Sequence, residues 1–190
     1  GNSAWYKSQY KIADKLIYSQ LRKAIGGDWD VIVSGSAAIQ PQLVSFFTAI
    51  GMPIFEGYGL TETSPVIAVS NREPHGCCAG TVGFPIQGVE VKIVENNEIV
   101  CRGHNVMKGY YKAPDITAEA IDKDGWFHTG DLARVDNDGF YYICGRSKNV
   151  IVTRNGKNIY PEELEALLMK EKIVKECMVV GADDGKDDTI

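Results

Sequence analysis

The sequence predicts a mixed α/β fold built from successive parts with different patterns. Up to about residue 75, helical and strand patterns alternate, which favours part of a parallel sheet with helices beside it. From about residue 76 to 145, short apolar runs are separated by turn residues, which favours a small antiparallel β subdomain. The remaining residues, 146–190, again combine strand patterns with one helix.

Two helices are expected in the first part. Residues 7–25 repeat apolar side chains at near-helical spacing up to Gly26 and Gly27, so we expect a helix that packs on another element. A second helix has Pro41 in its first turn and ends at Gly51. Its buried side chains are expected to be Leu43, Val44, Phe46, Phe47 and Ile50.

Two short apolar runs in this part, 31–33 and 52–55, are typical of buried strands. The first is followed by a turn of small residues at 34–38, and the second by a glycine-containing stretch at 57–62. Ligands of parallel sheets sit beyond the carboxyl ends of the strands. We therefore expect the two turns to line one crevice.

The β subdomain contains one strong hairpin signal. Residues 136–139, Asp-Asn-Asp-Gly, separate the apolar runs 132–135 and 140–144. Strands are also expected at 89–93 and 99–101. A short helix is expected at 114–121.

The last part begins with a strand pattern at 150–152, followed by a polar turn at 154–158. A helix opens at Pro161, and its buried stripe is expected to be Leu164, Leu167 and Leu168. Residues 177–180 resemble another strand, and the chain stops in an acidic segment at 183–188. We expect the chain to be an internal piece of a longer protein.

Composition favours a globular protein of a reducing compartment, and we expect the cytoplasm. The net charge is −5 and no Lys or Arg cluster is present, which argues against nucleic-acid binding. No apolar run approaches the roughly 20 residues of a membrane span. The cysteines form no C-x-x-C pair, so a zinc site is not expected. They are Cys77, Cys78, Cys101, Cys144 and Cys177.

Residues 55–62 carry the densest chemistry of the chain. Its glycines remove Cβ where a ligand can approach the backbone, and Tyr58 offers a ring for stacking. Thr61 and Glu62 offer oxygen ligands for a hard cation such as Mg²⁺. Taken alone, the stretch is equally compatible with a strand that leaves the sheet through a glycine turn.

Asp131 and Arg146 flank the predicted hairpin. If the hairpin pairs, both side chains reach one edge of the β subdomain. A carboxylate beside a guanidinium can bind the two hydroxyls of a ribose. In isolation, the two residues favour the alternative, an ordinary surface ion pair.

The ordered set of motifs resembles the adenylate-forming superfamily, which contains acyl-CoA synthetases, luciferases and the adenylation domains of peptide synthetases. The resemblance covers nearly the whole chain from about residue 10. Residues 13–27 and 156–163 look most like bacterial long-chain fatty-acid CoA ligases. The motifs that carry the resemblance are 34–38, 58–62, 102–103, 108–111, 124–131, 145–148 and 156–165.

The resemblance implies an ATP-dependent acid–thiol ligase that uses Mg²⁺. A carboxylic acid attacks the α-phosphate of ATP to give an acyl-adenylate and pyrophosphate, and coenzyme A then displaces AMP. An aryl- or medium-chain-acid CoA ligase is the second interpretation. A non-catalytic nucleotide-binding module is the third, because a fold alone does not establish activity.

The resemblance also implies roles for individual residues. Thr61 resembles the phosphate contact, Glu62 the Mg²⁺ ligand, and Asp131 the ribose-binding carboxylate with Arg146 beside it. The adenine pocket and its stacking floor, with their neighbouring nucleotide contacts, are expected at Gly35, Ser36, Ala37, Glu56, Gly57, Tyr58 and Gly59.

Two further roles follow from the resemblance. Lys148 falls at the hinge between a large and a small domain, although an ordinary exposed lysine fits the sequence equally well. Gly156 resembles the glycine beside the channel for the pantetheine arm of coenzyme A. The segment 145–156 departs from the commonest family spacing by one additional residue.

The expected domains are a partial α/β nucleotide-binding subdomain at 1–75, the antiparallel subdomain at 76–145, and the hinge with a truncated C-terminal domain at 146–190. The family's phosphate loop would precede this chain and its C-terminal lysine would follow Ile190. We therefore expect no catalysis by the chain alone. Peripheral membrane association of the longer protein and dimerisation through an open sheet edge are further expectations.

Overall fold

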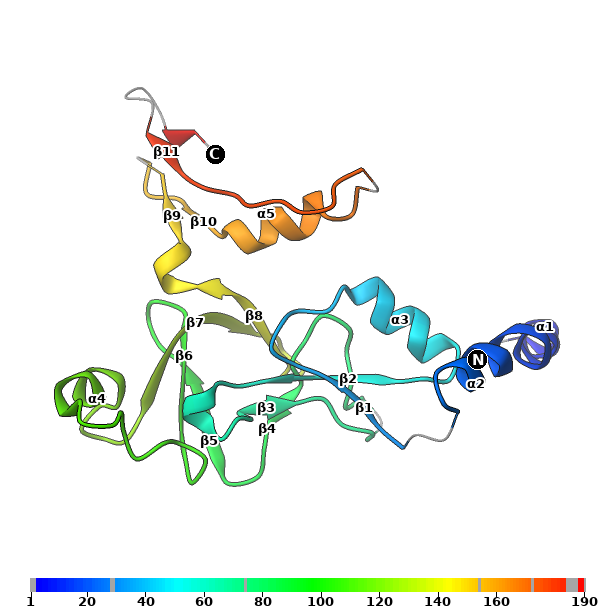
Figure 1. Ribbon diagram of the computed structural model, residues 1–190, viewed down its shortest axis with the longest axis horizontal. Coiled ribbons are helices and arrows are strands. Elements are labelled where there is room, and N and C mark those ends of the chain that lie inside the picture. Colours follow the sequence, from blue (N-terminus) through cyan, green and yellow to red (C-terminus); the bar gives the residue numbers. More distant parts are fainter. Residues whose placement is uncertain are drawn as a thin grey trace.

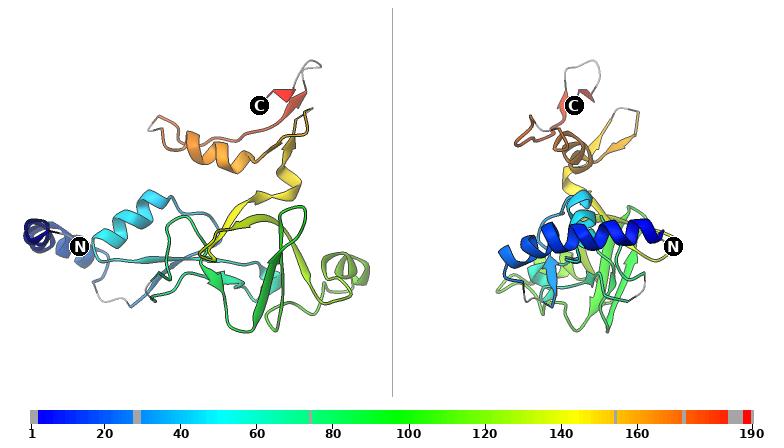
Figure 2. Two further views of the ribbon diagram at one scale, coloured as in Figure 1. Left: turned by 180° about the vertical axis from the view of Figure 1, so that it is seen from behind. Right: turned by 90° about the vertical axis from the view of Figure 1, so that its right-hand side faces the viewer.

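The computed structural model describes residues 3–27, 30–73, 75–153, 155–171, 173–183 and 188–189, and it confirms the expected mixed α/β class (Figure 1). Two four-stranded sheets form the body of the molecule, and two short hairpins lie near the C-terminus. The N-terminal helix lies beyond α3 (Pro41–Ala49), at the end opposite α4 (Pro114–Ala120), as Figures 1 and 2 show.

The first sheet has the order β1-β2-β3-β4 and is only partly parallel. β1 (Ile32–Ser34) is parallel to β2 (Ile54–Tyr58), with Ser34 opposite Glu56. β3 (Ala68–Val69) and β4 (Phe84–Pro85) continue the sheet with antiparallel pairing. The parallel relation expected from the sequence therefore holds for β1 and β2, and the chain then turns back on itself.

The N-terminal helix is confirmed and runs through α1 (Ala4–Ala13), a π-helical turn (Asp14–Tyr18) and α2 (Ser19–Ala24). The helix is joined to the end of α3 by two hydrogen bonds from its side chains. The Tyr10 hydroxyl donates to the Ala49 carbonyl at 3.0 Å, and Arg22 donates to the Ile50 carbonyl at 2.7 Å. The expected apolar packing is not formed, because no described element covers the stripe. Its exposed members are Ile12, Leu16, Ile17, Leu21 and Ile25.

The burial expected for α3 and β1 is also only partly correct. Val44 in α3 and Ile50 just after it are buried, whereas Leu43 and Phe46 are exposed and Phe47 is half-buried. β1 is the outermost strand of its sheet, and its flanking Val31 and internal Val33 are both exposed. These side chains are open because no further described layer packs on this edge.

The second sheet is an antiparallel meander of order β5-β6-β7-β8 and confirms the expected β subdomain pattern. The strands are β5 (Val89–Ile93), β6 (Glu98–Gly103), β7 (Phe127–Val135) and β8 (Tyr141–Arg146), with α4 in the connection from β6 to β7. The hairpin turn is closed by Asp136, whose Oδ1 accepts from the N–H groups of Asp138 at 3.0 Å and Phe140 at 2.9 Å.

The core joins the two sheets. Ile67, which precedes β3, packs with Val89, Cys101 and Phe127 of the second sheet. Tyr58 at the end of β2 lies against the same cluster. Burial of these apolar side chains therefore brings the carboxyl end of β2 to the second sheet.

The C-terminal part follows a 3₁₀ turn (Ser147–Asn149). β9 (Ile151–Val152) pairs with β10 (Asn158–Ile159), and α5 (Pro161–Leu168) follows, as expected. Residue 154 of the expected polar turn lies outside the described residues. The last hairpin pairs β11 (Ala182–Asp183) with β12 (Asp188–Thr189), and residues 184–187 of the expected acidic segment also lie outside the described part.

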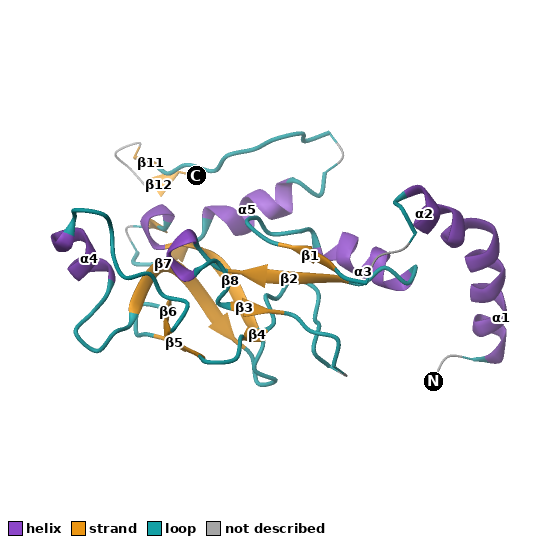
Figure 3. Cartoon of the chain, turned by 60° about the horizontal axis from the view of Figure 1, so that its bottom comes forward, coloured by secondary structure: helices purple, strands orange, loops and turns teal. Residues whose placement is uncertain are grey.

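Two expectations for this part are wrong. Residues 177–180 form a loop and not a strand (Figure 3), because the Val179 N–H donates to Glu165 Oε1 at 2.8 Å and not to a strand neighbour. In α5, Leu167 and Leu168 are exposed and Leu164 is half-buried, so the helix does not bury the expected stripe.

Replacing Gly83 by Ala should destabilise the junction of the two sheets. Gly83 has φ +73° and a Cβ there would overlap Ser70 N and the Val69 carbonyl. The Gly83 carbonyl also accepts from Tyr141 N–H at 3.2 Å. The expected loss is about 1–2 kcal/mol for the left-handed conformation and about 1–3 kcal/mol more for overpacking.

Gly139→Ala is the matched control for this measurement. Gly139 has φ +88°, but its nearest neighbour would be Phe84 at an ordinary 3.5 Å. Urea unfolding of both variants separates the two costs. Equal losses in the free energy of unfolding would contradict the proposed backbone overlap at Gly83.

Candidate functional site

The carboxyl end of β2 leads directly into a tight 3₁₀ turn, Thr61–Thr63. Gly59 is required there by the chain itself, because a Cβ would overlap the Pro65 carbonyl. Thr63 is fully buried, and its Oγ1 accepts from Leu60 N–H at 2.9 Å and lies 2.9 Å from the Pro65 carbonyl oxygen. These contacts fix the turn that carries Thr61 and Glu62. Sequence reasoning missed Thr63.

The turn after β1 lies beside β2. Gly35 follows the strand, and its Cβ position would be 3.5 Å from the Gly57 carbonyl oxygen. Ser36 has φ +68°, and Gly35, Ser36 and Ala37 are exposed. The two glycine-containing turns therefore lie at one edge, as the parallel pairing of β1 and β2 predicts.

Tyr58, Asp131 and Arg146 come together from three strands. The Tyr58 hydroxyl donates to Asp131 Oδ2 at 2.6 Å, and Arg146 Nε lies 2.7 Å from Asp131 Oδ1. Asp131 and Arg146 are direct partners in the β7–β8 register, which confirms that the hairpin brings them together. Asp131 is buried and the Arg146 side chain is largely exposed.

β7 holds Asp131 through its own irregular backbone. Gly130 has φ +72°, and its N–H donates to Glu98 Oε1 at 2.8 Å. The Thr129 hydroxyl donates to the Ile99 carbonyl at 2.7 Å and accepts from Asp131 N–H at 3.0 Å. Glu98 and Thr129 are positioning groups that the sequence patterns did not indicate.

The electrostatics keep the phenol neutral. Burial raises the pKa of Tyr58, and the Asp131 charge raises it further. Burial also raises the pKa of Asp131 above its ordinary value of 3.8, while the Tyr58 hydrogen bond and the Arg146 charge oppose that shift. The Tyr58 phenol therefore stays a hydrogen-bond donor to Asp131.

Glu62 is held by the segment that precedes α4. The Tyr110 hydroxyl donates to Glu62 Oε1 at 3.0 Å, and Met107 N–H donates to the Glu62 carbonyl at 2.7 Å. Thr61 is exposed and Glu62 is half-buried. Sequence reasoning did not identify Tyr110 as a partner of Glu62.

Glu56 lies away from this edge. Its side chain is buried, and its Oε1 accepts from Gly80 N–H at 3.0 Å. Burial raises the pKa of Glu56, and the Gly80 hydrogen bond opposes that shift. The Glu56 carbonyl accepts from Ser70 N–H at 2.9 Å, so both polar ends of Glu56 serve the fold.

Lys148 and Gly156 lie in the C-terminal part. Lys148 is exposed in the 3₁₀ turn that connects β8 to β9. Gly156 has φ +75° in the turn between β9 and β10, and its Cβ position has no heavy atom within 4 Å. The described structure thus leaves both positions open to solvent.

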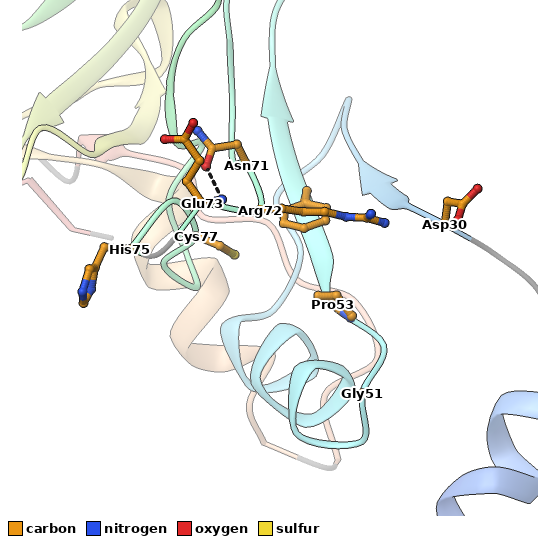
Figure 4. A pocket seen from close by; sticks show the side chains of 9 residues that line it. Asp30, Gly51, Pro53, Asn71, Arg72, Glu73, His75 and Cys77 are labelled. Atoms are coloured by element: carbon orange, nitrogen blue, oxygen red, sulfur yellow. Dashed lines mark hydrogen bonds between the residues drawn. The ribbon is translucent and has the colours of Figure 1, made fainter. Parts of the chain in front are cut away.

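A separate open cleft of about 600 Å³ lies at the other end of β2 (Figure 4). Its lining includes Gly51, Pro53, Phe55, Arg72 and Cys77. None of the expected nucleotide-binding residues lines this cleft.

Within the described ranges, no three His, Cys, Asp or Glu side chains gather in a way that could hold a metal ion. In the same ranges, no helix combines the length and apolar character needed to cross a membrane. All five cysteines are free.

Comparisons with known proteins agree with the motifs. A family model described as AMP-binding enzyme matches residues 7–111. The long-chain-fatty-acid–CoA ligase FadD15 of Mycobacterium bovis is 41% identical over 175 residues, which are 92% of this chain and 29% of the relative. The 2-succinylbenzoate–CoA ligase of a Geobacillus species is 38% identical over 163 residues, which are 81% of this chain and 32% of the relative.

Solved structures show the same fold. The o-succinylbenzoate CoA synthetase of Bacillus subtilis with its acyl-adenylate intermediate OSB-AMP is 33% identical, with a TM-score of 0.76 over 83% of this chain and 34% of the other. The same enzyme with ATP and magnesium ion gives a TM-score of 0.75 at 32% identity, over 83% of this chain and 35% of the other.

The chain spans only 29% of the length of FadD15. Over that span, the family match, the sequence identity and the shared fold agree with the ordered motifs. The chain therefore belongs to the family of AMP-binding enzymes.

Proposed function

We propose that this chain carries much of the nucleotide-binding side of an ATP-dependent acid–thiol ligase that converts a long-chain fatty acid to its coenzyme A thioester. In the first step, a carboxylate oxygen of the acid attacks the α-phosphorus of ATP and pyrophosphate leaves. In the second, the coenzyme A thiolate attacks the acyl carbonyl carbon and AMP leaves. The observation that carries the proposal is the buried carboxylate of Asp131, held by Tyr58 and Arg146.

Asp131 is proposed to bind the ribose. Tyr58 and Arg146 each hold one oxygen of its carboxylate, at 2.6 and 2.7 Å, and this fixes its orientation. Each carboxylate oxygen has more than one acceptor site, so both can also accept from the vicinal hydroxyls of a ribose. Fixed polar groups of this kind lower the ordering cost of binding.

The adenine ring is proposed to lie between the turn at 35–37 and the end of β2. The Cβ positions of Gly35 and Gly57 would meet neighbours at no less than 3.5 Å, so packing of the chain does not itself require glycine at either position. The missing side chains leave room for a flat ring, and the Tyr58 ring offers a stacking surface. Glu56 is proposed to contribute only through its place in β2.

The residues at the 3₁₀ turn fit a magnesium ion. Thr61 and Glu62 present oxygen ligands, which hard cations prefer, and Mg²⁺ needs few protein ligands because it retains water and binds phosphate oxygens. When bound, the ion would offset negative charge on the phosphates of ATP. We assign Glu62 as its protein ligand and Thr61 as a phosphate contact.

The C-terminal part is proposed to serve the second step. Lys148 lies in the short connection between β8 and β9, where a change of φ and ψ would rotate the following unit. The open backbone at Gly156 has no neighbour within 4 Å of its Cβ position, which suits passage of the pantetheine arm. The roles of Lys148 and Gly156 stay predictions. The same holds for three properties of the longer protein: its cytoplasmic location, its association with a membrane, and its self-association through the exposed edge of β1.

An aryl-acid CoA ligase is the second candidate. The observation that favours it is the identity of 38% with a 2-succinylbenzoate–CoA ligase, close to the 41% found with the fatty-acid ligase. A non-catalytic nucleotide-binding module is disfavoured, because Thr61, Glu62, Asp131 and Arg146 are all of the chemical types that the reaction needs.

Pyrophosphate release tests the substrate class. The protein that carries this chain at the full length of its relatives should release pyrophosphate with ATP, Mg²⁺ and coenzyme A, at rates that rise along a series from acetate to palmitate. Glu62→Gln should lower the rate about a hundredfold or more, because it removes the charge of the metal ligand. Glu119→Gln, an exposed change on α4, should leave the rate unchanged.

Other outcomes select other functions. Release with benzoate or cinnamate only would establish the aryl-acid reaction. Silence of the full-length protein across the acids would overturn the ligase proposal. The 190-residue chain alone should form no thioester, and detectable product from it would contradict the expected need for residues outside the chain.

Nucleotide binding should be lost on acidification at a higher pH than an ordinary Asp would cause. The pKa of Asp131 is raised above 3.8, and binding of ribose hydroxyls by acceptance alone needs the ionised carboxylate. Calorimetric titration of the full-length protein with ATP, at pH values from about 7 down to about 4, should show that the affinity for ATP decreases as the pH is lowered. Asp131→Asn should weaken binding about ten- to a hundredfold at pH 7 and flatten the pH profile.

Asp138→Asn, an exposed change in the hairpin turn, is the control and should keep the wild-type profile. A raised folded-state pKa means that protonated Asp131 favours the folded state, and this contribution is lost as pH rises. Protonation of Asp131 should therefore weaken nucleotide binding without unfolding the protein. Circular dichroism at the same pH values checks that the protein stays folded. An unchanged pH profile in Asp131→Asn would contradict the assignment.

A further inference from the structure

The segment before α4, residues 107–110, forms two hydrogen bonds with Glu62. Met107 N–H donates to the Glu62 carbonyl at 2.7 Å, and the Tyr110 hydroxyl donates to Glu62 Oε1 at 3.0 Å. The two bonds fix both the backbone and the carboxylate of a residue that lies 48 positions from Tyr110 in the sequence. Nothing in the proposed reaction itself uses Tyr110.

Tyr110 is itself held by the first turn of α4. Its N–H donates to Thr117 Oγ1 at 2.9 Å, and the Thr117 hydroxyl donates to the Ala113 carbonyl at 2.9 Å. Gly109 lets the chain pass close to Thr117, because a Cβ at Gly109 would lie 2.7 Å from Thr117 Cγ2. Further back, the buried Asn105 donates from Nδ2 to the Val66 carbonyl at 2.8 Å. The phenol thus reaches Glu62 from a braced loop.

The hydrogen bond makes the two carboxylate oxygens of Glu62 different. Oε1 accepts from a phenol, and within the described residues no hydrogen bond reaches Oε2. An ionised carboxylate can only accept hydrogen bonds, so the phenol is the donor of this contact. A carboxylate held in this way presents one oxygen to a cation and has its rotation restricted.

On the basis of the proposed function, we propose that Tyr110 is a positioning residue that orients the Glu62 carboxylate for a divalent cation at the Thr61–Thr63 turn. The cation would meet Oε2, while the phenol retains Oε1. Partners that orient a metal ligand in this way commonly change metal affinity about ten- to a hundredfold when they are removed.

Tyr111 supplies a matched control in the next position. Its side chain is 88% exposed, and its described partner is the Lys112 ammonium at 5.3 Å from the ring centroid. Tyr111→Phe removes the same hydroxyl group as Tyr110→Phe, one residue away from the contact with Glu62. The difference in Mn²⁺ affinity between the two variants therefore excludes effects that any loss of a tyrosine hydroxyl in this segment would cause.

Binding of Mn²⁺ to the full-length protein in the presence of ATP, followed by electron paramagnetic resonance, tests the proposal without turnover. Tyr110→Phe should weaken Mn²⁺ binding about ten- to a hundredfold relative to Tyr111→Phe. Thr117→Val, which removes the brace and keeps the phenol, should give a smaller loss. In the pyrophosphate assay, Tyr110→Phe should raise the Mg²⁺ concentration that gives the half-maximal rate.

Equal Mn²⁺ affinities of Tyr110→Phe and Tyr111→Phe would overturn the role of Tyr110, and so would an absence of Mn²⁺ binding by the wild-type protein. A protein that binds Mn²⁺ in a Tyr110-dependent way but releases no pyrophosphate would retain this inference and refute the proposed ligase reaction. Thermal unfolding of both variants checks that the fold is intact.

Discussion

The buried carboxylate of Asp131 is the constraint on which the arrangement of the site depends. An unpaired charge at this depth would be costly, so its two oxygens need partners. Tyr58 supplies one from the end of β2, and Arg146 supplies the other from the end of β8. The two sheets must therefore meet at this point, and the apolar cluster of Ile67, Val89, Cys101 and Phe127 beneath it holds them together.

Local chemistry was sufficient to predict one half of this cluster. The turn at 136–139 specifies a hairpin that brings Asp131 and Arg146 to one edge, as the sequence predicts. Their direct pairing also depends on a β-bulge between Leu132 and Ala133, which shifts the register and which the turn does not specify. The Tyr58 contact was not predictable in the same way, because it spans 73 positions and depends on how the sheets pack. The same holds for Tyr110 and Glu62, whose contact no local pattern signals.

Apolar periodicity predicted where helices form better than what they bury. The patterns at 7–25 and after Pro41 gave correct helices, but Leu16 and Phe46 are exposed. A periodic stripe reports that a helix has an apolar face and says nothing of which element covers it. Glu56 shows the opposite case, a charged residue that is buried. The sequence suggested a nucleotide contact for it, but its carboxylate accepts a hydrogen bond from Gly80 N–H inside the fold.

The glycines at the end of β2 divide by what excludes a side chain. At Gly59 the excluding group is the Pro65 carbonyl, so the fold alone demands glycine. At Gly57 the nearest neighbour of a Cβ would be Val69 at an ordinary 3.6 Å, and at Gly35 it would be the Gly57 carbonyl at 3.5 Å. The proposed nucleotide site gives a reason for glycine at these two positions, because a residue without a side chain lets a flat ligand approach the backbone closely. Gly59 is thus a structural glycine, whereas Gly35 and Gly57 are glycines for which the proposed function, and not the packing of the chain, supplies a reason.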